Sequence, residues 1–158
     1  MDLTLRPTLP DDLPFVLALE RDEANRPFIA PWPEERHRAA MADPDCLHAI
    51  LQGEERHGFL ILMGRTSPHR AIEFRRIVVD GKGRGVGRSA VRLLKRLAFK
   101  DWKAHRLWLD VKSFNDRAKA LYLSEGFKEE GLLRDCLWSG DRYESLVIMS
   151  MLESEYVD

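Results

Sequence analysis

The sequence is poor in cysteine: it holds only Cys46 and Cys136, and neither lies in a metal-ligand spacing. We therefore expect free thiols in a reducing compartment and exclude a disulfide framework and a thiolate zinc site. The chain also lacks any apolar run approaching the roughly 20 residues that a membrane-spanning helix requires. Its first residues, Met-Asp-Leu-Thr, lack the basic and then apolar pattern of a signal peptide. These absences predict a cytoplasmic protein.

The sequence also lacks an excess of charge of either sign. Lys and Arg number 25 and Asp and Glu number 26, which leaves a formal net charge of −1. Proteins dedicated to nucleic acids or membrane surfaces carry a basic excess, so we expect neither as a partner. The 158 residues suffice for one domain with its own core, spanning residues 1–158.

What the sequence does contain is a series of apolar patterns that predict strands and helices. Strands are expected over residues 3–6, 46–52, 58–63, 71–80, 105–112, 131–138 and 143–152, and helices over 13–19, 34–41, 86–102 and 115–124. The first strands suit an antiparallel meander, and a β-α-β unit follows in the middle of the chain. We predict a mixed α/β fold with a central, mostly antiparallel sheet of about six to seven strands and about four helices.

A glycine-rich turn joins the strand at 71–80 to the amphipathic helix at 86–102. It reads Lys82-Gly83-Arg84-Gly85-Val86-Gly87-Arg88. Such a turn points several backbone N–H groups at one place, where the helix dipole also favours negative charge. Three cationic side chains add to this field. The turn therefore predicts a site for a phosphate or pyrophosphate group.

Three other interpretations of this turn fit the sequence less well. A nucleotide-triphosphate loop requires Gly-Lys-Ser/Thr at its end, and Arg88 stands where that lysine belongs. A dinucleotide fingerprint fits the short form Gly85-x-Gly87-x-x-Ala90, but roughly 70 residues follow it, too few for that fold. A plain tight turn needs fewer glycines and no flanking cations.

A second motif follows downstream, Asn115-x-x-Ala118-x-x-Leu121-Tyr122-x-x-x-Gly126-Phe127. Together the two motifs resemble the GNAT superfamily of acyl-CoA-dependent N-acetyltransferases, from about Leu3 to the C-terminus. One departure is Lys82, where that family more often has Gln or Arg. The tail after Gly126 resembles the branch that includes the ribosomal-protein N-terminal and spermidine acetyltransferases. A non-catalytic acyl-CoA-binding or sensing domain of the same fold is the alternative.

The resemblance implies a V-shaped splay between strands four and five, with acetyl-CoA as co-substrate in the gap and no metal. Unpaired backbone groups there would bind the pantetheine arm, and the glycine turn would hold the pyrophosphate. The residues implied in acetyl-CoA binding are Ile77, Val78, Val79, Lys82, Gly83, Arg84, Gly85, Val86, Gly87, Arg88, Asn115 and Ala118. Asn115 also suits a helix N-cap, a structural role that would coexist with binding.

The resemblance makes Tyr122 the general acid that protonates the departing thiolate of CoA. An alkylamine is mostly protonated at neutral pH, so a base must first remove its proton. Glu73, on the strand before the glycine turn, is the first candidate, and Asp110 on the facing strand is the second. Either carboxylate could instead pair with an arginine, such as Arg75, Arg76 or Arg106. A backbone N–H near Val78 would stabilise the oxyanion.

The expected acceptor is a primary amine: a polyamine, a peptide or protein N-terminus, or another small amine. Phe28, Trp32 and Glu20, with Asp110, are candidates to line its site. Carboxylates that could serve a polyamine, or simply face solvent, are Glu20, Asp22, Glu23, Glu34 and Glu35. The histidines are expected on loops and strand edges, with no clustering that suggests a metal site. The last two strands could pair across a homodimer.

Overall fold

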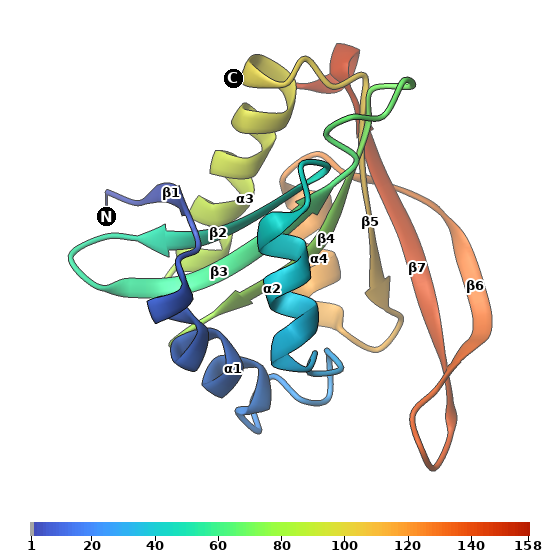
Figure 1. Cartoon of the computed structure of the whole chain (residues 1–158). Helices are drawn as coiled ribbons and strands as arrows, with labels where there is room; N and C mark the ends of the chain where they lie inside the picture. Colours follow the sequence, from blue (N-terminus) through green and yellow to red (C-terminus); the bar gives the residue numbers. More distant parts are fainter. Residues whose placement is uncertain (1) are drawn as a thin grey trace.

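The computed structural model describes residues 2–158 and contains one seven-stranded sheet, with strand order β1-β2-β3-β4-β5-β7-β6 (Figure 1). The strands are β1 (Thr4–Pro7), β2 (Cys46–Gln52), β3 (Arg56–Met63), β4 (Ala71–Val79), β5 (Arg106–Lys112), β6 (Lys128–Trp138) and β7 (Tyr143–Leu152). The helices are α1 (Leu13–Arg21), α2 (Glu34–Ala42), α3 (Val86–Arg96) and α4 (Asp116–Ser124), with short turns η1 (Pro10–Asp12), η2 (Leu97–Asp101) and η3 (Glu153–Glu155). The mixed α/β prediction is confirmed.

The sheet opens between β4 and β5. These two strands are the parallel neighbours, and they pair only where residues 71–73 face residues 106–108. Both strands continue beyond that point, β4 to Val79 and β5 to Lys112, without pairing to each other. Figure 1 shows the two strands diverging. The predicted splay is confirmed, and it leaves two facing strand edges with backbone groups free to bind a ligand.

The sheet is covered on both faces. Apolar side chains of α3, among them Val86, Ala90 and Leu94, pack in a core with Leu107 and Leu109 of β5. A smaller core on the other face joins α1, α2 and the loop between them to β2, β3 and β4. Figure 1 shows α1 and α2 in front of the sheet and α3 behind it. The seam between β4 and β5 thus lies in the middle of a rigid, packed body.

A bulge in β4 adjusts which side chains face the seam. Ile61 pairs with Arg76 and Leu62 with Phe74, so Arg75 is an extra residue on β4. An extra residue changes which face the following side chains point to and sharpens the local twist. Phe74 therefore belongs to the larger core, whereas Val78 packs in the smaller one.

The predicted elements differ from the structure mainly at their ends. The helix expected over 86–102 stops at Arg96 and continues as a π-helical turn, η2. There the Trp102 N–H donates to the Leu97 carbonyl, 2.9 Å away and five residues back. An apolar repeat near 3.6 does not distinguish that turn from the α-helix before it. β6 begins at Lys128 rather than 131, and all of its residues are exposed.

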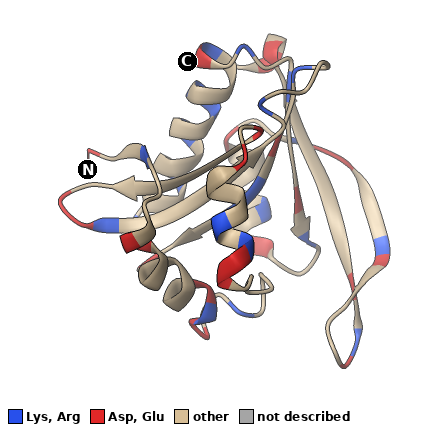
Figure 2. Cartoon of the chain, in the orientation of Figure 1, with Lys and Arg blue, Asp and Glu red and all other residues tan. Residues whose placement is uncertain are grey.

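Charged residues of both signs are spread over the helices and loops, as the balanced composition leads one to expect (Figure 2). Cys46 is buried and Cys136 exposed, and both are free thiols. Among residues 2–158, no helix is both long and apolar enough to cross a bilayer.

Candidate active site

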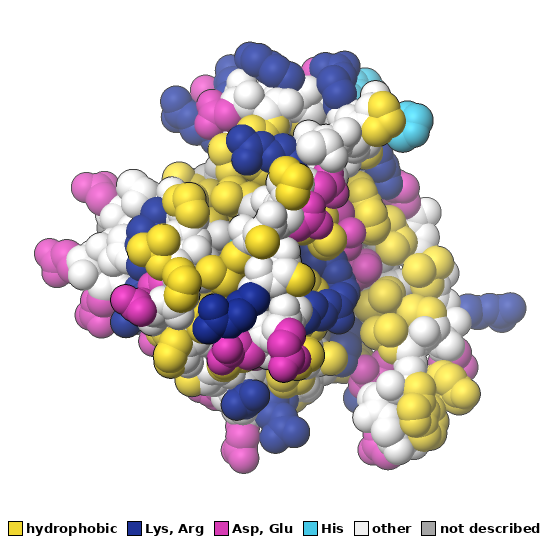
Figure 3. Space-filling model, viewed as in Figure 1, with side chains coloured by type: hydrophobic (Ala, Val, Ile, Leu, Met, Phe, Trp, Pro, Cys, Tyr) yellow, Lys and Arg dark blue, Asp and Glu magenta, His cyan; other side chains and the backbone are white. Residues whose placement is uncertain are grey.

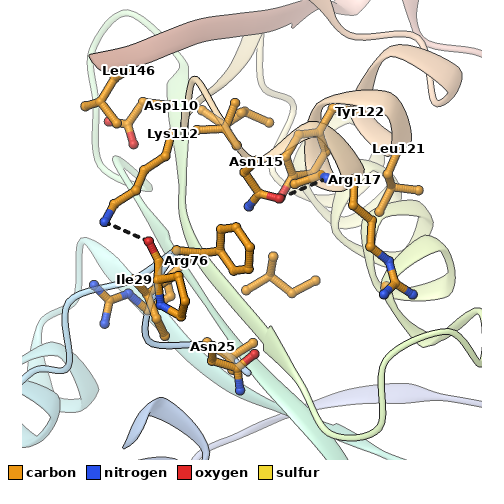
Figure 4. Close-up of a pocket in the computed structure, with 18 of the residues that line it drawn as sticks. Asn25, Ile29, Arg76, Asp110, Lys112, Asn115, Arg117, Leu121, Tyr122 and Leu146 are labelled. Carbon is orange, nitrogen blue, oxygen red and sulfur yellow. Dashed lines mark hydrogen bonds between the residues drawn. The ribbon is translucent and has the colours of Figure 1, made fainter. Parts of the chain in front are cut away.

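A cleft of about 1530 Å³ occupies the seam where β4 and β5 part. Six parts of the chain line it: the loop at 25–31, β4 from Phe74 on, the end of β5, the glycine turn, α4 with Asn115 before it, and residues 137–146 of the β6–β7 hairpin. Figure 4 shows side chains from α4, β4 and β5 converging on this space. Segments far apart in sequence therefore meet at one site.

The glycine turn has the backbone shape that requires glycine. Gly83 and Gly85 have φ of +89° and +77°, in the left-handed region that other residues rarely adopt. Gly85 is the N-cap of α3, so the N–H groups that follow it have no partner within the helix. No atom lies within 4 Å of the place where a Cβ on Gly85 would stand. Nothing in the chain itself therefore blocks the approach of an anion to these N–H groups.

The cations around the turn are arranged differently from the sequence expectation. Lys82 lines the cleft, where burial and the charge of Arg117 hold its pKa below the usual value. Arg84 lies outside the lining and bonds back to the carbonyls of Asp80 and Gly81, at 3.2 and 3.3 Å. Arg88 lines the cleft but is paired with Glu125 at 2.6 Å.

Arg117 is a cleft-lining cation that the sequence analysis missed. Its guanidinium nitrogen lies 3.4 Å from where a Cβ on Gly83 would stand, so it sits beside the glycine turn. Arg117 falls within the second motif, but spacing along the chain does not show that α4 brings this side chain to the turn. Of the residues implied in acetyl-CoA binding, Val86 and Arg84 lie outside the lining and the other ten line it.

Asn115 caps α4 and also lines the cleft. Its Oδ1 accepts a hydrogen bond from the Ala118 N–H at 3.3 Å, which confirms the N-cap of α4 (Figure 4). Both residues line the cleft. The side-chain NH₂ of Asn115 has no hydrogen-bond partner among residues 2–158 and is available to a ligand carbonyl.

Tyr122 lies at the inner end of the cleft, one helical turn beyond Ala118. Its ring packs edge-on against Phe74 and Phe127, with centroids 5.8 and 5.9 Å away. Burial raises the pKa of the phenol above its ordinary value of 10.0. Tyr122 therefore stays protonated at neutral pH and can donate to a group that gains negative charge.

Two carboxylates lie beside the seam, and only one of them lines the cleft. Asp110 does so, whereas Glu73 lies outside the lining and is 3.8 Å from Arg75. Burial raises the pKa of each carboxyl, partly offset by the charge of Arg75. Asp110 further raises the pKa of Glu73, so the two groups influence each other.

The acceptor residues predicted from sequence divide in the same way. Phe28 lines the cleft and packs near Phe114, with ring centroids 6.0 Å apart. The prediction that Glu20 and Trp32 line the acceptor site is wrong, because both are buried beneath the loop at 25–31 and lie outside the lining. The other carboxylates considered for a polyamine, Asp22, Glu23, Glu34 and Glu35, are exposed and also outside the lining.

Glu20 instead holds the smaller core together. One oxygen accepts from the Trp32 N–H at 3.1 Å and contacts His37 Nε2 at 2.6 Å, and the other pairs with Arg76. Burial alone would raise the pKa of Glu20, but His37 and Arg76 keep it below the usual value. Arg76 lines the cleft, so this buried carboxylate fixes both the loop and one cleft residue.

The expectation that the histidines lie on loops and strand edges is wrong for two of them. His37 of α2 and His48 of β2 are buried and in contact, with 2.9 Å between His37 Nδ1 and His48 Nε2. His48 Nδ1 lies 2.7 Å from the Thr8 hydroxyl. Within residues 2–158 no group of His, Cys, Asp and Glu is arranged to hold a metal ion.

Lys112 crosses the outer part of the cleft. Its ammonium donates to the Pro27 carbonyl at 3.1 Å and pairs with Glu144 of β7 at 2.8 Å (Figure 4). The side chain thereby ties the loop at 25–31 to β5 and β7. No sequence pattern indicated this bridge.

Comparison with known proteins gives one consistent family. Residues 14–127 match the acetyltransferase (GNAT) family. The chain is 26% identical over 169 residues to the spermidine N(1)-acetyltransferase of Vibrio cholerae, covering 99% of this chain and 96% of that protein. It is 35% identical over 112 residues to the N-alpha-acetyltransferase RimI of Mycobacterium tuberculosis, covering 66% of each.

Solved structures agree with these matches. The spermidine N-acetyltransferase of Vibrio cholerae in complex with CoA and spermine superimposes with a TM-score of 0.88 at 25% identity, covering 99% of this chain and 98% of that one. The likeness thus extends over the whole sheet, including the splayed strands and the β6–β7 hairpin.

Proposed function

We propose that this chain, which belongs to the acetyltransferase (GNAT) family, acetylates a small-molecule primary amine with the residues of the seam cleft. It is an acetyl-CoA-dependent N-acetyltransferase that acts on a primary amine. The roles of individual residues and the acceptor class are the proposal. The observation that carries it is the meeting of the glycine turn, Asn115 and Tyr122 along one cleft between diverging strands.

The donor binds along the seam. The pantetheine amides pair with the free edge of β4 and with the Asn115 side chain. The pyrophosphate sits on the N–H groups at the start of α3, where Lys82 and Arg117 add positive charge. Arg88 joins them if its bond to Glu125 lengthens, and Arg84 braces the turn. This placement directs the thioester toward Tyr122.

The reaction needs no covalent enzyme intermediate. A base takes the proton from the ammonium, the nitrogen lone pair forms the N–C bond, and the C–S bond then breaks. A backbone N–H near Val78 stabilises the oxyanion that forms on attack. Tyr122 donates its proton to the sulfur as the C–S bond breaks, and the surplus proton on the nitrogen leaves as the amide forms and restores the phenol. Asp110 is the better base because it lines the cleft and its raised pKa makes it more basic, with Glu73 as the alternative.

A thiol-release assay on a panel of amines tests this function. Acetyl-CoA should yield free CoA and N-acetylated amine in equal amounts, and Tyr122→Phe should slow the release. Tight binding of acetyl-CoA without release from any amine would support a sensing domain instead.

We further propose that the β6–β7 ribbon joins two copies of the chain. β6 is an edge strand whose backbone is unpaired on one side, and it exposes Leu132, Leu133 and Trp138. Sedimentation should give a dimer, and Leu133→Glu should convert it to a monomer. A monomeric wild-type protein would refute this.

A cytoplasmic location is a proposal that rests on the two free cysteines.

A further inference from the structure

The acceptor half of the cleft is rich in positive charge. The acceptor half is the part of the cleft bounded by residues 25–31, the end of β5 and residues 137–146. Figure 3 shows Lys and Arg side chains gathered in the hollow between α2 and the β7 ribbon. The charged side chains that decide the argument are Arg75, Arg76, Asp110, Lys112, Arg142 and Glu144. How they pair determines which charges remain for an acceptor.

The two arginines of β4 already have partners beneath the surface of the cleft. Arg76 pairs with Glu20, and both side chains are buried. Arg75 lies 3.8 Å from Glu73. These pairs leave no net charge on β4. The other charged residues that line the acceptor half are Arg26, Asp110, Asp141 and the groups around Glu144.

Asp110 is the carboxylate that can receive an ammonium. It lines the cleft and has no cation within 4 Å among residues 2–158, so its charge is not consumed by an ion pair. Asp141, the other lining carboxylate outside the Glu144 cluster, is at the exposed hairpin tip and accepts a bond from the Ser139 hydroxyl at 2.9 Å. The deeper end of the acceptor half thus offers one negative charge.

Glu144, in contrast, is already shared by two cations. Lys112 lies 2.8 Å from it and Arg142 lies 3.2 Å from it, while the carboxylate itself is only 7% exposed. Both cations also lie over the Phe114 ring, at 5.8 and 5.2 Å from its centroid. The cluster carries two positive charges and one negative. Arg142, which is 63% exposed, has donors free for another anion.

We infer that the acceptor carries an anionic group, a carboxylate, beyond its reacting amine. The amine approaches Asp110, and the carboxylate is held by Lys112 and Arg142 at the mouth. A polyamine would place a second ammonium against these two cations, and the Glu144 carboxylate between them is already paired with both. The inference rests on the proposed acetyl transfer. It gives this protein a different class of acceptor from the polyamine named for its spermidine-acetylating relatives.

The spacing of Asp110 and Lys112 along β5 gives the scale of an acceptor that would reach both residues. Asp110 and Lys112 are two residues apart on β5, so they share a face and their Cα atoms lie about 7 Å apart, which gives the scale of the site rather than the exact separation of the charges. An extended chain of four methylenes separates an amine from a carboxylate by roughly 6 Å. Short ω-amino carboxylates therefore match the site.

A pair of matched amines tests the inference. 5-Aminopentanoate and 1,4-diaminobutane both have four methylenes and a primary amine, and they differ in the charge at the far end. The kcat/KM for 5-aminopentanoate should exceed that for 1,4-diaminobutane about tenfold or more, because only one of them is attracted to the Lys112–Arg142 pair. Arg142→Glu should remove or reverse that preference. Arg134→Glu, an exposed β6 arginine outside the cleft lining, should leave it unchanged.

Equal or better use of 1,4-diaminobutane by the wild-type protein would overturn the inference, as would a preference that survives Arg142→Glu. If neither amine releases CoA, the acetyl transfer fails, and calorimetry on the protein–CoA complex then decides the charge preference by itself. There, 5-aminopentanoate must bind more tightly than 1,4-diaminobutane, and equal or reversed affinity refutes the inference.

Discussion

The imidazoles of His37 and His48 touch in the interior, with 2.9 Å between Nδ1 of the first and Nε2 of the second. Burial lowers the pKa of His48, so its ring is neutral at neutral pH. One assignment of the ring protons pairs every nitrogen: His37 Nε2–H donates to the ionised Glu20, His48 Nε2–H donates to His37 Nδ1, and the Thr8 hydroxyl donates to His48 Nδ1. The chain of donors runs one way from Thr8 to Glu20. An added proton would oppose it.

The buried His48 ring predicts that the protein loses stability in mild acid. Burial lowers the pKa of His48 from 6.5 to about 4, so between these values the unfolded chain binds a proton that the folded one refuses. The stabilisation is complete above pH 6.5 and is lost as pH falls toward 4, by up to about 3 kcal/mol. Urea unfolding between pH 7.5 and 4.5 measures it. In His48→Asn the pH dependence over this range should be smaller, and an unchanged slope would contradict the assignment.

Glu20→Ala is expected to destabilise the protein strongly. The change leaves the Arg76 guanidinium, the His37 imidazole and the Trp32 N–H without a buried acceptor. Removing one member of a buried ion pair costs about 3–5 kcal/mol. Glu34→Ala is the matched control, because its pair with Arg38 is about half exposed and is worth less than about 1 kcal/mol. Equal losses in denaturant unfolding would contradict the role of Glu20.

The substitution Tyr122→Phe tests whether the Tyr122 hydroxyl is the general acid. The ring keeps its contacts with Phe74 and Phe127, so the fold and acetyl-CoA binding should be unchanged. The kcat should fall about 100-fold or more, since general acid catalysis contributes at least that much. Steady-state kinetics and calorimetry measure the two quantities. Unchanged turnover would remove Tyr122 from the mechanism.

Asp110→Asn and Glu73→Gln distinguish the two candidate bases. If Asp110 takes the proton, its substitution should lower kcat/KM about 100-fold or more and remove the acid limb of the pH profile. Because burial raises its pKa, that limb should lie at a higher pH than an ordinary aspartate gives. Glu73→Gln should cost less than about tenfold, because Glu73 lies outside the cleft lining. The reverse order would make Glu73 the base.

Local rules sufficed for the parts of the site that depend on neighbours in sequence. The N-cap at Asn115 and the stop at Gly126, with φ of +97°, are set by the geometry of one helix. Gly83 and Gly85 are likewise glycines because the turn needs positive φ. The diverging edges of β4 and β5 followed from the resemblance carried by these same motifs.

The rest depends on contacts between distant segments, which no local pattern contains. Glu20 and Arg76 are 56 residues apart, and Lys112 and Pro27 are 85 apart. Glu20 resembled a surface carboxylate because its buried partners come from other elements. Arg84 resembled a phosphate ligand because its charge is visible in sequence, whereas its bonds to the turn are not.

A crystal structure of the protein with bound CoA tests the central claim most directly. The account predicts the pyrophosphate on the N–H groups that follow Gly85, beside Lys82 and Arg117. It also predicts the sulfur within about 3.5 Å of the Tyr122 hydroxyl. CoA phosphates bound away from the glycine turn, or a phenol that does not reach the sulfur, would contradict it.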